Sequence, residues 1–493
     1  ENIINLKAKN EIIIEERDEE EWVYLYSFYN AENQIAERIT KLDKARNVKK
    51  VSNIEKELKL IEERTDILLS EKQKEAIRAI NDNNVTIITG GPGTGKTTII
   101  KSIIEIYKQK KYKIVLCAPT GRAAKRMSET TGEEASTLHR LLEIGKVDEE
   151  SLFKKKSEYK GAPIDGDIII VDEVSMVDMF IMSYLLDCIY QGTKLILVGD
   201  SDQLPSVGPG SVLKDLIASE KIVTVHLDKI FRQAAKSKII VNAHRVNNGK
   251  RFINKEDPEL EEDANQDFFF IRETNQEKIL KEVLSLCNGR LKNFGEYDFF
   301  ENIQVLTPTK KGLLGTKELN KALQEALNPH RDGEAEKNSM GATFRIGDRV
   351  MQIKNNYDMY WEKLCDSGVE TGNGIFNGET GIITNINEKG KNLSVKFDDE
   401  KVCKYEFNDL EQIEHSYCMT IHKAQGSEFD VVIMIVPQAA PMLLTRNLLY
   451  TGLTRAKKLL IVIGNDKVVD YMIKNVDSKK RNTGLEFKLK NNI

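Results

Sequence analysis

Short apolar runs rich in β-branched residues alternate with longer amphipathic stretches over most of the chain. Continuous apolar runs of this length are typical of strands that a parallel sheet buries on both faces. The first set is VTIIT (85–89), KIVLCA (113–118), IIIVD (168–172) and KLILVGD (194–200). The second set is KIVTVHL (221–227), NIQVLTP (302–308), VVIMIV (431–436) and LLIVIG (459–464). The alternation predicts an α/β chain with two doubly wound domains, over residues 66–220 and over 221–342 continued by 412–493.

Three stretches depart from this pattern. Residues 1–65 are acidic and carry apolar side chains at helical spacing, such as Phe28, Ala31 and Ile35. They predict an N-terminal helical segment that offers a surface for protein partners. Between 343 and 411, short strands separated by Gly and Asn-Gly turns predict a small antiparallel barrel inserted in the second domain. The polar residues 143–166 predict a small hairpin inserted in the first domain.

Composition narrows the class of protein. The 493-residue chain has a net charge of −4, so any nucleic-acid site must be a local basic groove. Its six cysteines form no C-x-x-C pair, which indicates reduced thiols in a cytoplasmic protein and argues against structural zinc. No apolar run reaches the length of about 18 residues that a membrane helix needs, so we expect no membrane span. Because the chain begins with Glu1, we expect that an N-terminal piece is missing from it.

The strand VTIIT is followed directly by GGPGTGKTT, which matches the phosphate-binding pattern G-x-x-x-x-G-K-T from Gly90 to Thr97. In such a loop, backbone N–H groups surround the phosphates and the next helix N-terminus favours their charge. Lys96 is expected to reach the outer phosphates, and the Thr97 hydroxyl is expected to ligate Mg²⁺. The sequence therefore predicts ATP and Mg²⁺ as cofactors. The loop residues expected at the nucleotide are Gly91, Pro92, Gly93, Thr94, Gly95, Lys96, Thr97 and Thr98.

Polar residues follow two later strands of the first domain. Asp172 ends the strand IIIVD, where its carboxylate can hold Mg²⁺ together with Thr97. Glu173 comes next, where a carboxylate can orient or deprotonate the attacking water. Gln203 lies just past KLILVGD, so its amide can contact both water and γ-phosphate. We predict catalytic roles for Lys96, Glu173 and Gln203; the alternative for Gln203 is a plain turn residue.

Two arginines of the second domain are candidates to stabilise the charge that builds on the transferring phosphoryl group. Arg232 lies in HLDKIFRQ, and Arg455 lies in LLYTGLTRAKK directly before the strand LLIVIG. The alternative interpretation is a solvated charge at a strand edge. If the nucleotide lies between the two domains, both arginines reach it when the cleft closes. Hydrolysis is then coupled to domain motion.

The motif series resembles that of the superfamily 1 DNA helicases and is most similar to their RecD-like branch. In chain order the motifs are GGPGTGKTT, APTGRAAKRM, ASTLHRLL, VDEVSMVD, GDSDQLPSVGPG, IFRQ, TIHKAQGSEFD and LLYTGLTRAKK. The resemblance covers residues 15–470. It implies two RecA-like P-loop domains, a β-hairpin pin at 143–166 and an SH3-like barrel at 343–411. It also implies a nucleotide site that contains Gln73, at the adenine edge, with Lys96, Thr97, Asp172, Glu173, Gln203, Arg232 and Arg455.

Two segments, APTGR (118–122) and LTPTK (306–310), repeat the order strand, Pro-Thr, basic residue. A Thr hydroxyl and backbone N–H groups at such a turn can hold a DNA phosphate without reading bases. We expect Thr120 with Arg122, and Thr309 with Pro308, to be equivalent grips on the DNA backbone. The alternative is that each Pro-Thr only caps the next helix.

Further DNA contacts are expected from two other motifs. Thr420, His422 and Lys423 lie in TIHKAQGSEFD, and His139 lies in STLHRLL, where an imidazole can stack or hydrogen-bond. The alternative for each histidine is an ordinary surface or core residue. Gly426 and Glu428 of the same motif are expected to link the DNA to the nucleotide, the glutamate through the ribose.

The function that follows is an ATP-dependent DNA helicase, monomeric, moving 5′→3′ on single-stranded DNA and opening forked duplexes in repair or recombination. One alternative is the motor subunit of a multi-chain nuclease–helicase. Another is an ATP-switched DNA-binding translocase that does not unwind, because the pin insert is rich in Lys and Glu and lacks an aromatic wedge. An RNA helicase of the same superfamily is a further alternative.

Overall fold

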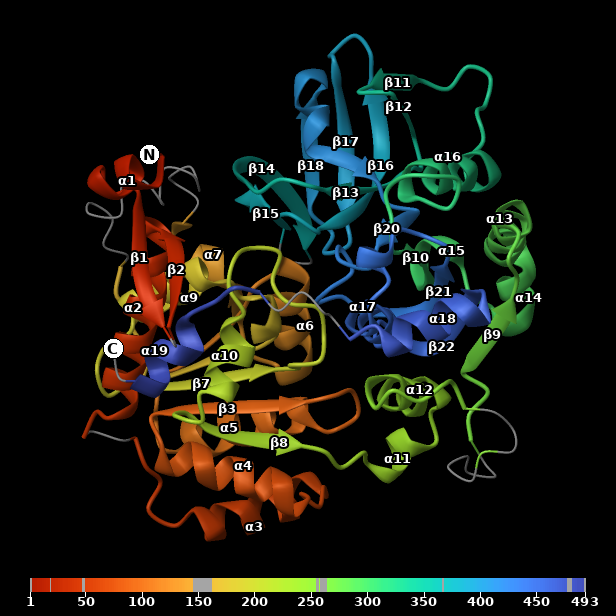
Figure 1. The fold of residues 1–493 in the computed structure, drawn as a ribbon. Coiled ribbons are helices and arrows are strands. Elements are labelled where there is room, and N and C mark those ends of the chain that lie inside the picture. The colour runs from red at the N-terminus through yellow and green to blue at the C-terminus, as the bar shows by residue number, and fades with distance from the viewer. Residues whose placement is uncertain are drawn as a thin grey trace.

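The computed structural model describes residues 2–17, 19–46, 49–144, 162–253, 257, 264–365, 368–476 and 481–491. Two parallel sheets lie side by side and an antiparallel barrel projects from the second (Figure 1). Residues 145–161 of the predicted pin at 143–166 lie outside the described residues. Among the described helices, none combines the length and the apolar character needed to cross a membrane.

The first sheet has six parallel strands in the order β5-β4-β6-β7-β3-β8. Ile87 and Ile88 are neighbours in β3, yet both are fully buried, in apolar clusters on opposite faces of the sheet. Helices on both faces therefore explain the continuous apolar runs. The strands are β3 (Val85–Gly90), β4 (Ile114–Ala118), β5 (Ala135–Thr137), β6 (Ile168–Val171), β7 (Lys194–Gly199) and β8 (Val223–Leu227). The helices are α2 (Tyr26–Asp43), α3 (Ile54–Thr65), α4 (Glu71–Asp82), α5 (Lys96–Gln109), α6 (Gly121–Thr131), α7 (Leu138–Leu141), η2 (Val174–Met176), α9 (Met179–Asp187) and α10 (Val212–Ala218).

The second sheet has five parallel strands in the order β20-β10-β21-β22-β9. The strands are β9 (Phe268–Arg272), β10 (Ile303–Thr307), β20 (Cys418–Thr420), β21 (Phe429–Val436) and β22 (Ala456–Gly464). One face packs on α12 (Lys238–Asn247), α17 (Arg446–Leu453) and α18 (Asp466–Lys474). The other packs on α13 (Gln276–Ser285), η3 (Leu286–Arg290), α14 (Leu291–Gly295), α15 (Phe299–Asn302) and α16 (Thr316–Leu327). The short elements α11 (Arg232–Ala235) and η5 (Pro441–Leu443) lie in connections.

The run 221–227 was predicted to open the second domain, and this prediction is wrong. Strand β8 pairs in parallel with β3 in the first sheet, with Thr86 opposite Val223. Val225 and Leu227 are buried in the cluster that α4 and α5 form on that sheet. An apolar run indicates a strand, but the sheet that the strand joins depends on the crossover before it, which periodicity does not encode.

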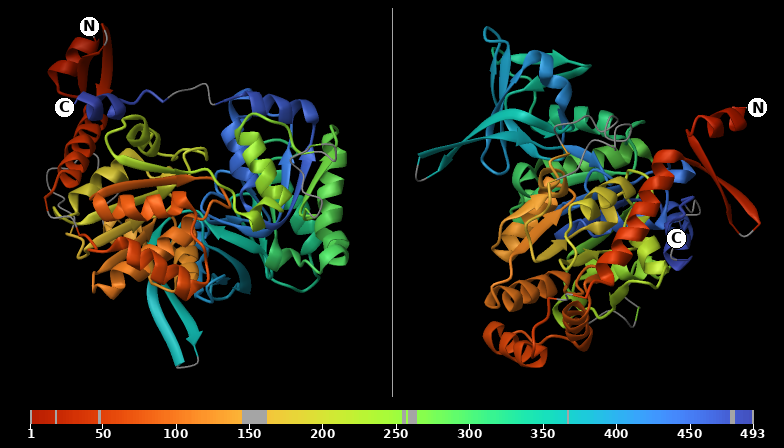
Figure 2. Two further views of the ribbon diagram at one scale, coloured as in Figure 1. Left: turned by 90° about the horizontal axis from the view of Figure 1, so that it is seen from below. Right: turned by 90° about the vertical axis from the view of Figure 1, so that its left-hand side faces the viewer.

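The barrel is a seven-stranded antiparallel sheet in the order β15-β14-β18-β17-β16-β13-β19. A hairpin of β11 (Glu336–Ser339) and β12 (Ala342–Arg345) precedes it, and η4 (Phe407–Gln412) lies before its last strand. In Figure 2 the hairpin of β14 and β15 extends away from the rest of the molecule. The barrel strands are β13 (Arg349–Gln352), β14 (Asn356–Cys365), β15 (Gly368–Ile375), β16 (Thr380–Asn387), β17 (Asn392–Phe397), β18 (Val402–Glu406) and β19 (Ile413–His415).

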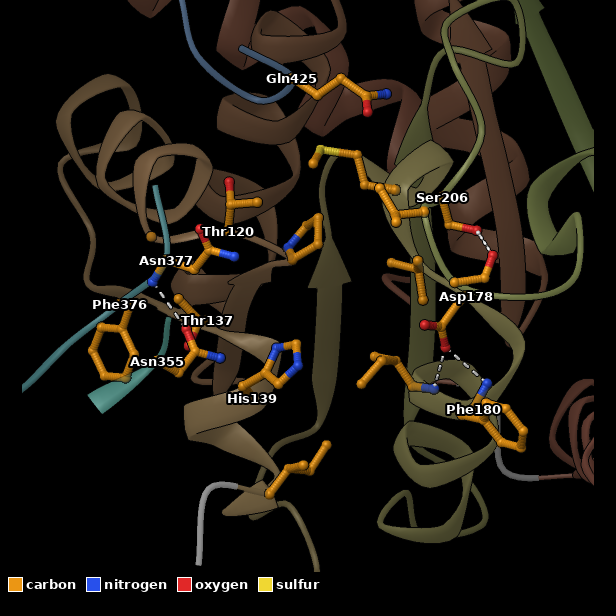
Figure 3. A pocket seen from close by; sticks show the side chains of 18 of the residues that line it. Thr120, Thr137, His139, Asp178, Phe180, Ser206, Asn355, Phe376, Asn377 and Gln425 are labelled. Atoms are coloured by element: carbon orange, nitrogen blue, oxygen red, sulfur yellow. Dashed lines mark hydrogen bonds between the residues drawn. The ribbon is translucent and has the colours of Figure 1, made fainter. Parts of the chain in front are cut away.

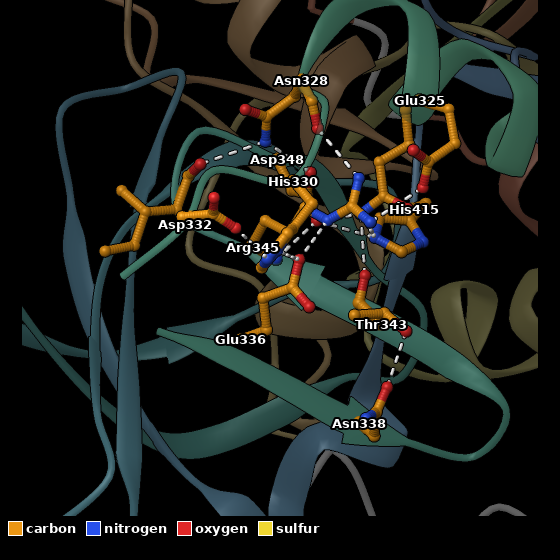
Figure 4. A network of polar contacts seen from close by, with 12 residues as sticks. Glu325, Asn328, His330, Asp332, Glu336, Asn338, Thr343, Arg345, Asp348 and His415 are labelled. Carbon is orange, nitrogen blue, oxygen red and sulfur yellow. Dashed lines mark hydrogen bonds and ion pairs between the residues drawn. The ribbon is translucent and has the colours of Figure 1, made fainter. Parts of the chain in front are cut away.

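A buried carboxylate, Asp348, joins the barrel to the second sheet (Figure 4). It accepts hydrogen bonds from Gln324 Nε2 at 2.7 Å and Asn328 Nδ2 at 2.8 Å, both at the end of α16. The Tyr417 hydroxyl donates to it at 2.9 Å, and His415 Nε2 lies 2.9 Å from it. A carboxylate with no solvent exposure needs such partners, so this network fixes the barrel on α16.

The N-terminal segment was predicted to be helical, and the structure corrects this. After α1 (Asn2–Ala8), β1 (Ile12–Arg17) and β2 (Glu20–Leu25) form an antiparallel hairpin with Ile14 opposite Val23. Isoleucines and aromatic residues favour strands here over the helical spacing that begins only in α2. Helix α2 itself is part of the first sheet's core, because Ile35 and Ile39 are fully buried there.

The C-terminal residues were predicted to belong to the second domain, and this is also wrong at the end of the chain. Helix α19 (Leu485–Asn491) packs against α2 and α10, and Leu485 and Leu489 are buried in the first sheet's core (Figure 1). An amphipathic stripe predicts that a helix is buried on one side but does not identify the sheet that covers it.

Candidate nucleotide and nucleic-acid site

The P-loop connects β3 to α5 through backbone that only glycine adopts without strain. Gly93 and Gly95 have φ angles of 73° and 83°, in the left-handed region. A Cβ on Gly95 would lie 2.3 Å from Gln73 Nε2, and one on Gly93 would lie 2.9 Å from the Ala234 Cβ. The loop therefore keeps its phosphate-binding shape with neighbouring residues closely packed around it.

Two residues that were predicted to bind the nucleotide, Lys96 and Gln73, donate hydrogen bonds to backbone carbonyls of the P-loop. Lys96 Nζ donates to the carbonyl oxygens of Gly90 and Gly91, the latter at 3.1 Å. Gln73 Nε2 donates to the Gly95 carbonyl at 3.3 Å, while its Oε1 accepts from the Ser70 N–H at 2.9 Å. Gln73 thus completes a capping box at the start of α4 and positions the loop. Its contact with adenine stays a prediction.

A cavity of about 740 Å³ lies beside the P-loop. Gly93, Gly95 and Thr98 line one side, and Phe231, Ala234, Lys457 and Lys458 are among the residues on the other sides. The Phe231 N–H donates to the Gly93 carbonyl at 3.4 Å, so the backbone of α11 lies against the loop. Arg232 begins α11, but its side chain lies outside the described part of the structure.

Asp172 and Glu173 follow β6 at the same edge of the sheet as the P-loop. Asp172 Oδ1 accepts from the Glu173 N–H at 2.8 Å, and Glu173 is buried in a left-handed conformation with φ 53°. Burial and the neighbouring Glu173 carboxylate raise the pKa of Asp172 to about 6, while Arg126 and Lys96 lower it. The hydroxyl of Thr97 and the Asp172 carboxylate are hard oxygen donors, which fit Mg²⁺.

Arg126 of α6, which the sequence analysis did not single out, connects two of the predicted residues. Its Nη1 lies 3.6 Å from Glu173 Oε1, and its Nη2 lies 2.8 Å from Glu428 Oε1. Glu428, which lies between β20 and β21 of the second sheet, is therefore joined to the Glu173 carboxylate through Arg126. Arg126 comes four residues after Arg122 in APTGRAAKRM, so the helical spacing could have indicated a second basic side chain on the same face.

Gln203 and Arg455, predicted from distant motifs, are in direct contact. Arg455 Nη2 donates to Gln203 Oε1 at 3.2 Å, and Gln203 Nε2 donates to Asp200 Oδ2 at 3.3 Å. Both side chains are buried, Arg455 to 2% exposure. The arginine is therefore not a solvated charge at a strand edge but a buried link between the two sheets.

Helix α17 makes further contacts with the loop after β7. The Tyr450 hydroxyl donates to Asp200 Oδ2 at 2.7 Å, and the Leu204 N–H donates to Thr451 Oγ1 at 2.9 Å. Burial raises the pKa of Asp200, and Lys96 and the Tyr450 hydroxyl oppose that shift. Asp200, Tyr450 and Thr451 were not predicted as site residues, although they lie in the quoted motifs GDSDQ and LLYTGLTR.

A second cavity, of about 450 Å³, which we call the groove, lies between the first sheet, the second sheet and the barrel (Figure 3). Three residues predicted to contact DNA line it: Thr120, His139 and His422. Burial lowers the pKa of His422, so this imidazole favours its neutral form. The remaining lining includes Asp178, Phe180, Ser206, Val207, Asn355, Phe376, Asn377 and Gln425.

Thr120 caps a helix and also lies at the contact between the two sheets. Its Oγ1 accepts from the Ala123 N–H at 3.2 Å at the start of α6. A Cβ on Gly426, which has a φ of 72°, would lie 2.9 Å from the same oxygen. The structure therefore places Gly426 against the start of α6, not in the nucleotide cavity.

The other predicted DNA residues lie away from the groove lining. Arg122 donates to Ser427 Oγ at 3.1 Å and to Thr380 Oγ1 of the barrel, and burial lowers its pKa to about 10. Lys423 pairs with Glu414, and Thr420 Oγ1 accepts from the Lys423 N–H at 3.3 Å. Thr309 follows Pro308 after β10 and contacts Lys311, whereas α16 begins only at Thr316. The two Pro-Thr segments are thus not equivalent in local structure.

Family models match three parts of the chain in order. Residues 73–209 match an AAA domain, residues 319–397 match the ATP-dependent RecD-like DNA helicase SH3 domain, and residues 415–463 match the UvrD-like helicase C-terminal domain. The matches confirm the predicted fold class, with RecA-like cores and an SH3-like insert in the second.

Solved structures of helicases show a weaker similarity to the chain. A Pif1 helicase at forked DNA is 20% identical with a TM-score of 0.46, covering 80% of this chain and 92% of that one. Pif1 from Candida albicans is 18% identical with a TM-score of 0.44, covering 82% of this chain and 99% of that one.

Two relatives are more similar to this chain in sequence than the solved structures are. The ATP-dependent RecD2 DNA helicase of Deinococcus radiodurans is 35% identical over 79% of this chain, which spans 48%, about half, of that relative's length. The RecBCD enzyme subunit RecD of Buchnera aphidicola is 29% identical, over 92% of this chain and 82% of that one. With the RecD-like SH3 domain match and the predicted motif series, these similarities establish that the chain belongs to the RecD-like superfamily 1 helicases.

Proposed function

We propose that this chain is an ATP-dependent DNA helicase that moves 5′→3′ along single-stranded DNA and opens forked duplexes. One observation carries the proposal. The loop after β7 contacts Arg455 and Tyr450 of the second sheet through Gln203 and Asp200, and a few residues later its Ser206 lines the groove. A change at the nucleotide can therefore reach the groove along one short segment of chain.

The roles at the nucleotide follow from position and chemistry. The P-loop N–H groups and Lys96 bind the phosphates, and the 740 Å³ cavity takes the base and ribose. Thr97 and Asp172 hold Mg²⁺, which neutralises phosphate charge when bound. Glu173 orients the attacking water, held in place by Arg126. Gln203, Arg455 and Arg232 contact the transferring phosphoryl group as its charge develops.

The groove takes single-stranded DNA. Thr120 offers a hydroxyl and a helix N-terminus to a phosphate, and Phe376 of the barrel offers an aromatic face to a base. His139 and His422 contribute hydrogen bonds. Thr309, after the corresponding strand of the second sheet, is the second grip. Closing and opening of the sheets around ATP then changes the distance between the grips and produces a step.

Steady-state ATP hydrolysis, measured with single-stranded DNA, single-stranded RNA or duplex DNA, tests this function. We expect single-stranded DNA to stimulate hydrolysis most and Lys96→Ala to abolish it. Thr120→Ala and Thr309→Ala are each expected to raise the DNA concentration needed for half-maximal stimulation. Equal stimulation by RNA would favour an RNA helicase, and unchanged half-saturation in both threonine variants would exclude the grips.

A second candidate is the motor subunit of a larger nuclease–helicase, because several relatives are RecD subunits of RecBCD enzymes. A chain of that kind would displace strands slowly alone and faster with its partners.

We further propose that the chain is a monomeric cytoplasmic protein of DNA repair or recombination. A single sedimentation boundary at monomer mass, with and without DNA, would support the stand-alone helicase.

A further inference from the structure

The last described segment, residues 481–491, is anchored to the first sheet although α18 before it covers the second (Figures 1 and 2). Thr483 Oγ1 lies 2.8 Å from Asp215 Oδ2 of α10 and 3.0 Å from Glu32 Oε1 of α2. The Gly484 N–H donates to the same Glu32 oxygen at 2.8 Å. With α19 buried on the same helices, the segment has a fixed position on the first sheet.

From this anchored segment, Arg481 reaches the loop PSVGPG, residues 205–210. Its guanidinium donates to three alternate backbone carbonyls of that loop. The acceptors are the Ser206 oxygen at 2.6 Å, the Gly208 oxygen at 2.6 Å and the Gly210 oxygen at 2.7 Å. A planar guanidinium can satisfy several acceptors in one geometry, which a lysine ammonium does not reproduce.

The other side of this loop forms a wall of the groove. Ser206, Val207 and Gly208 line the groove, and Figure 3 shows Ser206 and Asp178 facing Thr120 and His139 across it. Val207 is 87% exposed, so its side chain is not packed into any core. Helix α9 and its N-cap residue Asp178 pack against the loop. A Cβ on Gly208 would lie 2.1 Å from Asp178 Oδ2, and the Met179 N–H donates to the Pro209 carbonyl.

We propose that Arg481 is a positioning residue that holds this groove wall and thereby sets the affinity for single-stranded DNA. The inference rests on the proposed function of the groove. The loop has two glycines and an exposed valine, and the guanidinium binds three of its carbonyls, so losing Arg481 loosens the loop even though α9 backs it. Without Arg481, DNA binding must order the loop at the same time, which weakens binding. The three carbonyls that Arg481 binds belong to residues 206–210 and not to the P-loop, so we expect hydrolysis at saturating DNA to keep its rate.

The test compares Arg481→Met and Arg481→Lys with Lys490→Met, which removes an exposed cation of α19 that pairs with Glu486. Anisotropy of a labelled oligothymidylate gives the dissociation constant, and ATP hydrolysis gives the DNA half-saturation and the basal rate. Both Arg481 variants are expected to bind DNA about five- to tenfold more weakly with an unchanged basal rate. Hydrogen exchange of the amides of residues 206–210 is expected to accelerate in both. Lys490→Met is expected to behave as wild type.

The outcomes separate the two proposals. If Arg481→Lys binds as wild type while Arg481→Met is weaker, the residue acts through charge alone and the positioning role is overturned. Wild-type binding and loop exchange in both variants overturn it as well. If Arg481→Met does not fold, as judged by its melting temperature, Arg481→Lys decides. A wild-type chain that binds no single-stranded DNA instead refutes the proposed function of the groove.

Discussion

Arg455 is a buried side chain at the contact between the two sheets, and the proposed function also gives it a role in hydrolysis. A buried guanidinium is stable only when acceptors surround it. Its donors are used by the Thr451 carbonyl at 3.0 Å, the Ser427 carbonyl at 3.0 Å, the Thr454 hydroxyl at 2.9 Å and Gln203 Oε1 at 3.2 Å. The Gln203 contact is the only one of these four with the first sheet, so it is the one that a phosphoryl group can replace during hydrolysis.

We therefore predict that Arg455→Lys lowers kcat for ATP hydrolysis by about 10³-fold, because lysine cannot make the same set of bonds. ATP affinity should change much less, since the charge is needed mainly in the transition state. Single-turnover hydrolysis and the Kd of a fluorescent nucleotide measure the two effects. Arg272→Lys, at an exposed pair with Asp466, is the matched control. A loss of affinity as large as the loss of kcat would mean that Arg455 only stabilises the fold.

Lys194 is a buried cation at the end of a helix. Its side chain has no solvent exposure, and Nζ donates to the carbonyl oxygens of Ile80 and Asn83 at the end of α4. Burial lowers the pKa of Lys194 from 10.5 to about 7. Below pH 7 both the folded and unfolded states hold the proton. Between pH 7 and 10.5 only the unfolded state holds it, so the free energy of unfolding rises with pH.

We predict that the free energy of unfolding of wild type, relative to Lys194→Met, increases by about 2 kcal/mol from pH 6 to pH 9. Urea unfolding of both proteins at the two pH values measures the difference. The comparison removes the contribution of every other titrating group that the two proteins share. A difference that does not change with pH would show that the folded state keeps Lys194 charged.

Among the elements, the barrel is joined to the second sheet by a buried carboxylate. Asp348 collects donors from α16 and from the strands on either side, with no exposure to solvent. Asp348→Asn would turn an amide N–H toward groups that already donate, so a buried polar group would lose its partner. We expect the free energy of unfolding of the barrel to fall by about 3 kcal/mol.

Trp361 of β14 reports on the barrel, and Trp22→Phe removes the other tryptophan of the chain. Denaturant unfolding followed by Trp361 fluorescence therefore measures the effect of Asp348→Asn. Asp332→Asn, at a fully exposed carboxylate in the preceding loop, is the control. If both variants unfold at the same denaturant concentration, the network does not hold the barrel in place.

Elements with strong local signals were predictable from the sequence. Most strands around the P-loop are rich in Ile, Leu and Val, and GGPGTGKTT matches the phosphate-binding pattern. The sheet joined by β8 and the docking of α19 were not predictable, because both depend on contacts between distant segments. The sequence predicted Gln203 and Arg455 as site residues but not Asp200, Tyr450 and Arg126, because their contacts with residues of other motifs appear only in the structure.

In the whole molecule, the proposed nucleotide and DNA sites share one stretch of chain. From the end of β7 it passes Asp200 and Gln203, which contact α17, and then forms the groove wall that Arg481 holds. The first sheet thus supplies the loop, while the second sheet and the C-terminal segment contact it on either side. Under the proposed function, ATP and DNA each act on this same loop, as a motor requires.

Strand displacement on two matched duplexes, one with a 5′ and one with a 3′ single-stranded tail, tests the motor most directly. ATP-dependent displacement from the 5′-tailed duplex alone, abolished by Lys96→Ala, is the result expected of a 5′→3′ helicase. Displacement from the 3′-tailed duplex alone would contradict the proposed direction while leaving the ATP site intact. DNA-stimulated hydrolysis without displacement from either duplex would contradict unwinding itself and identify a translocase that needs a partner.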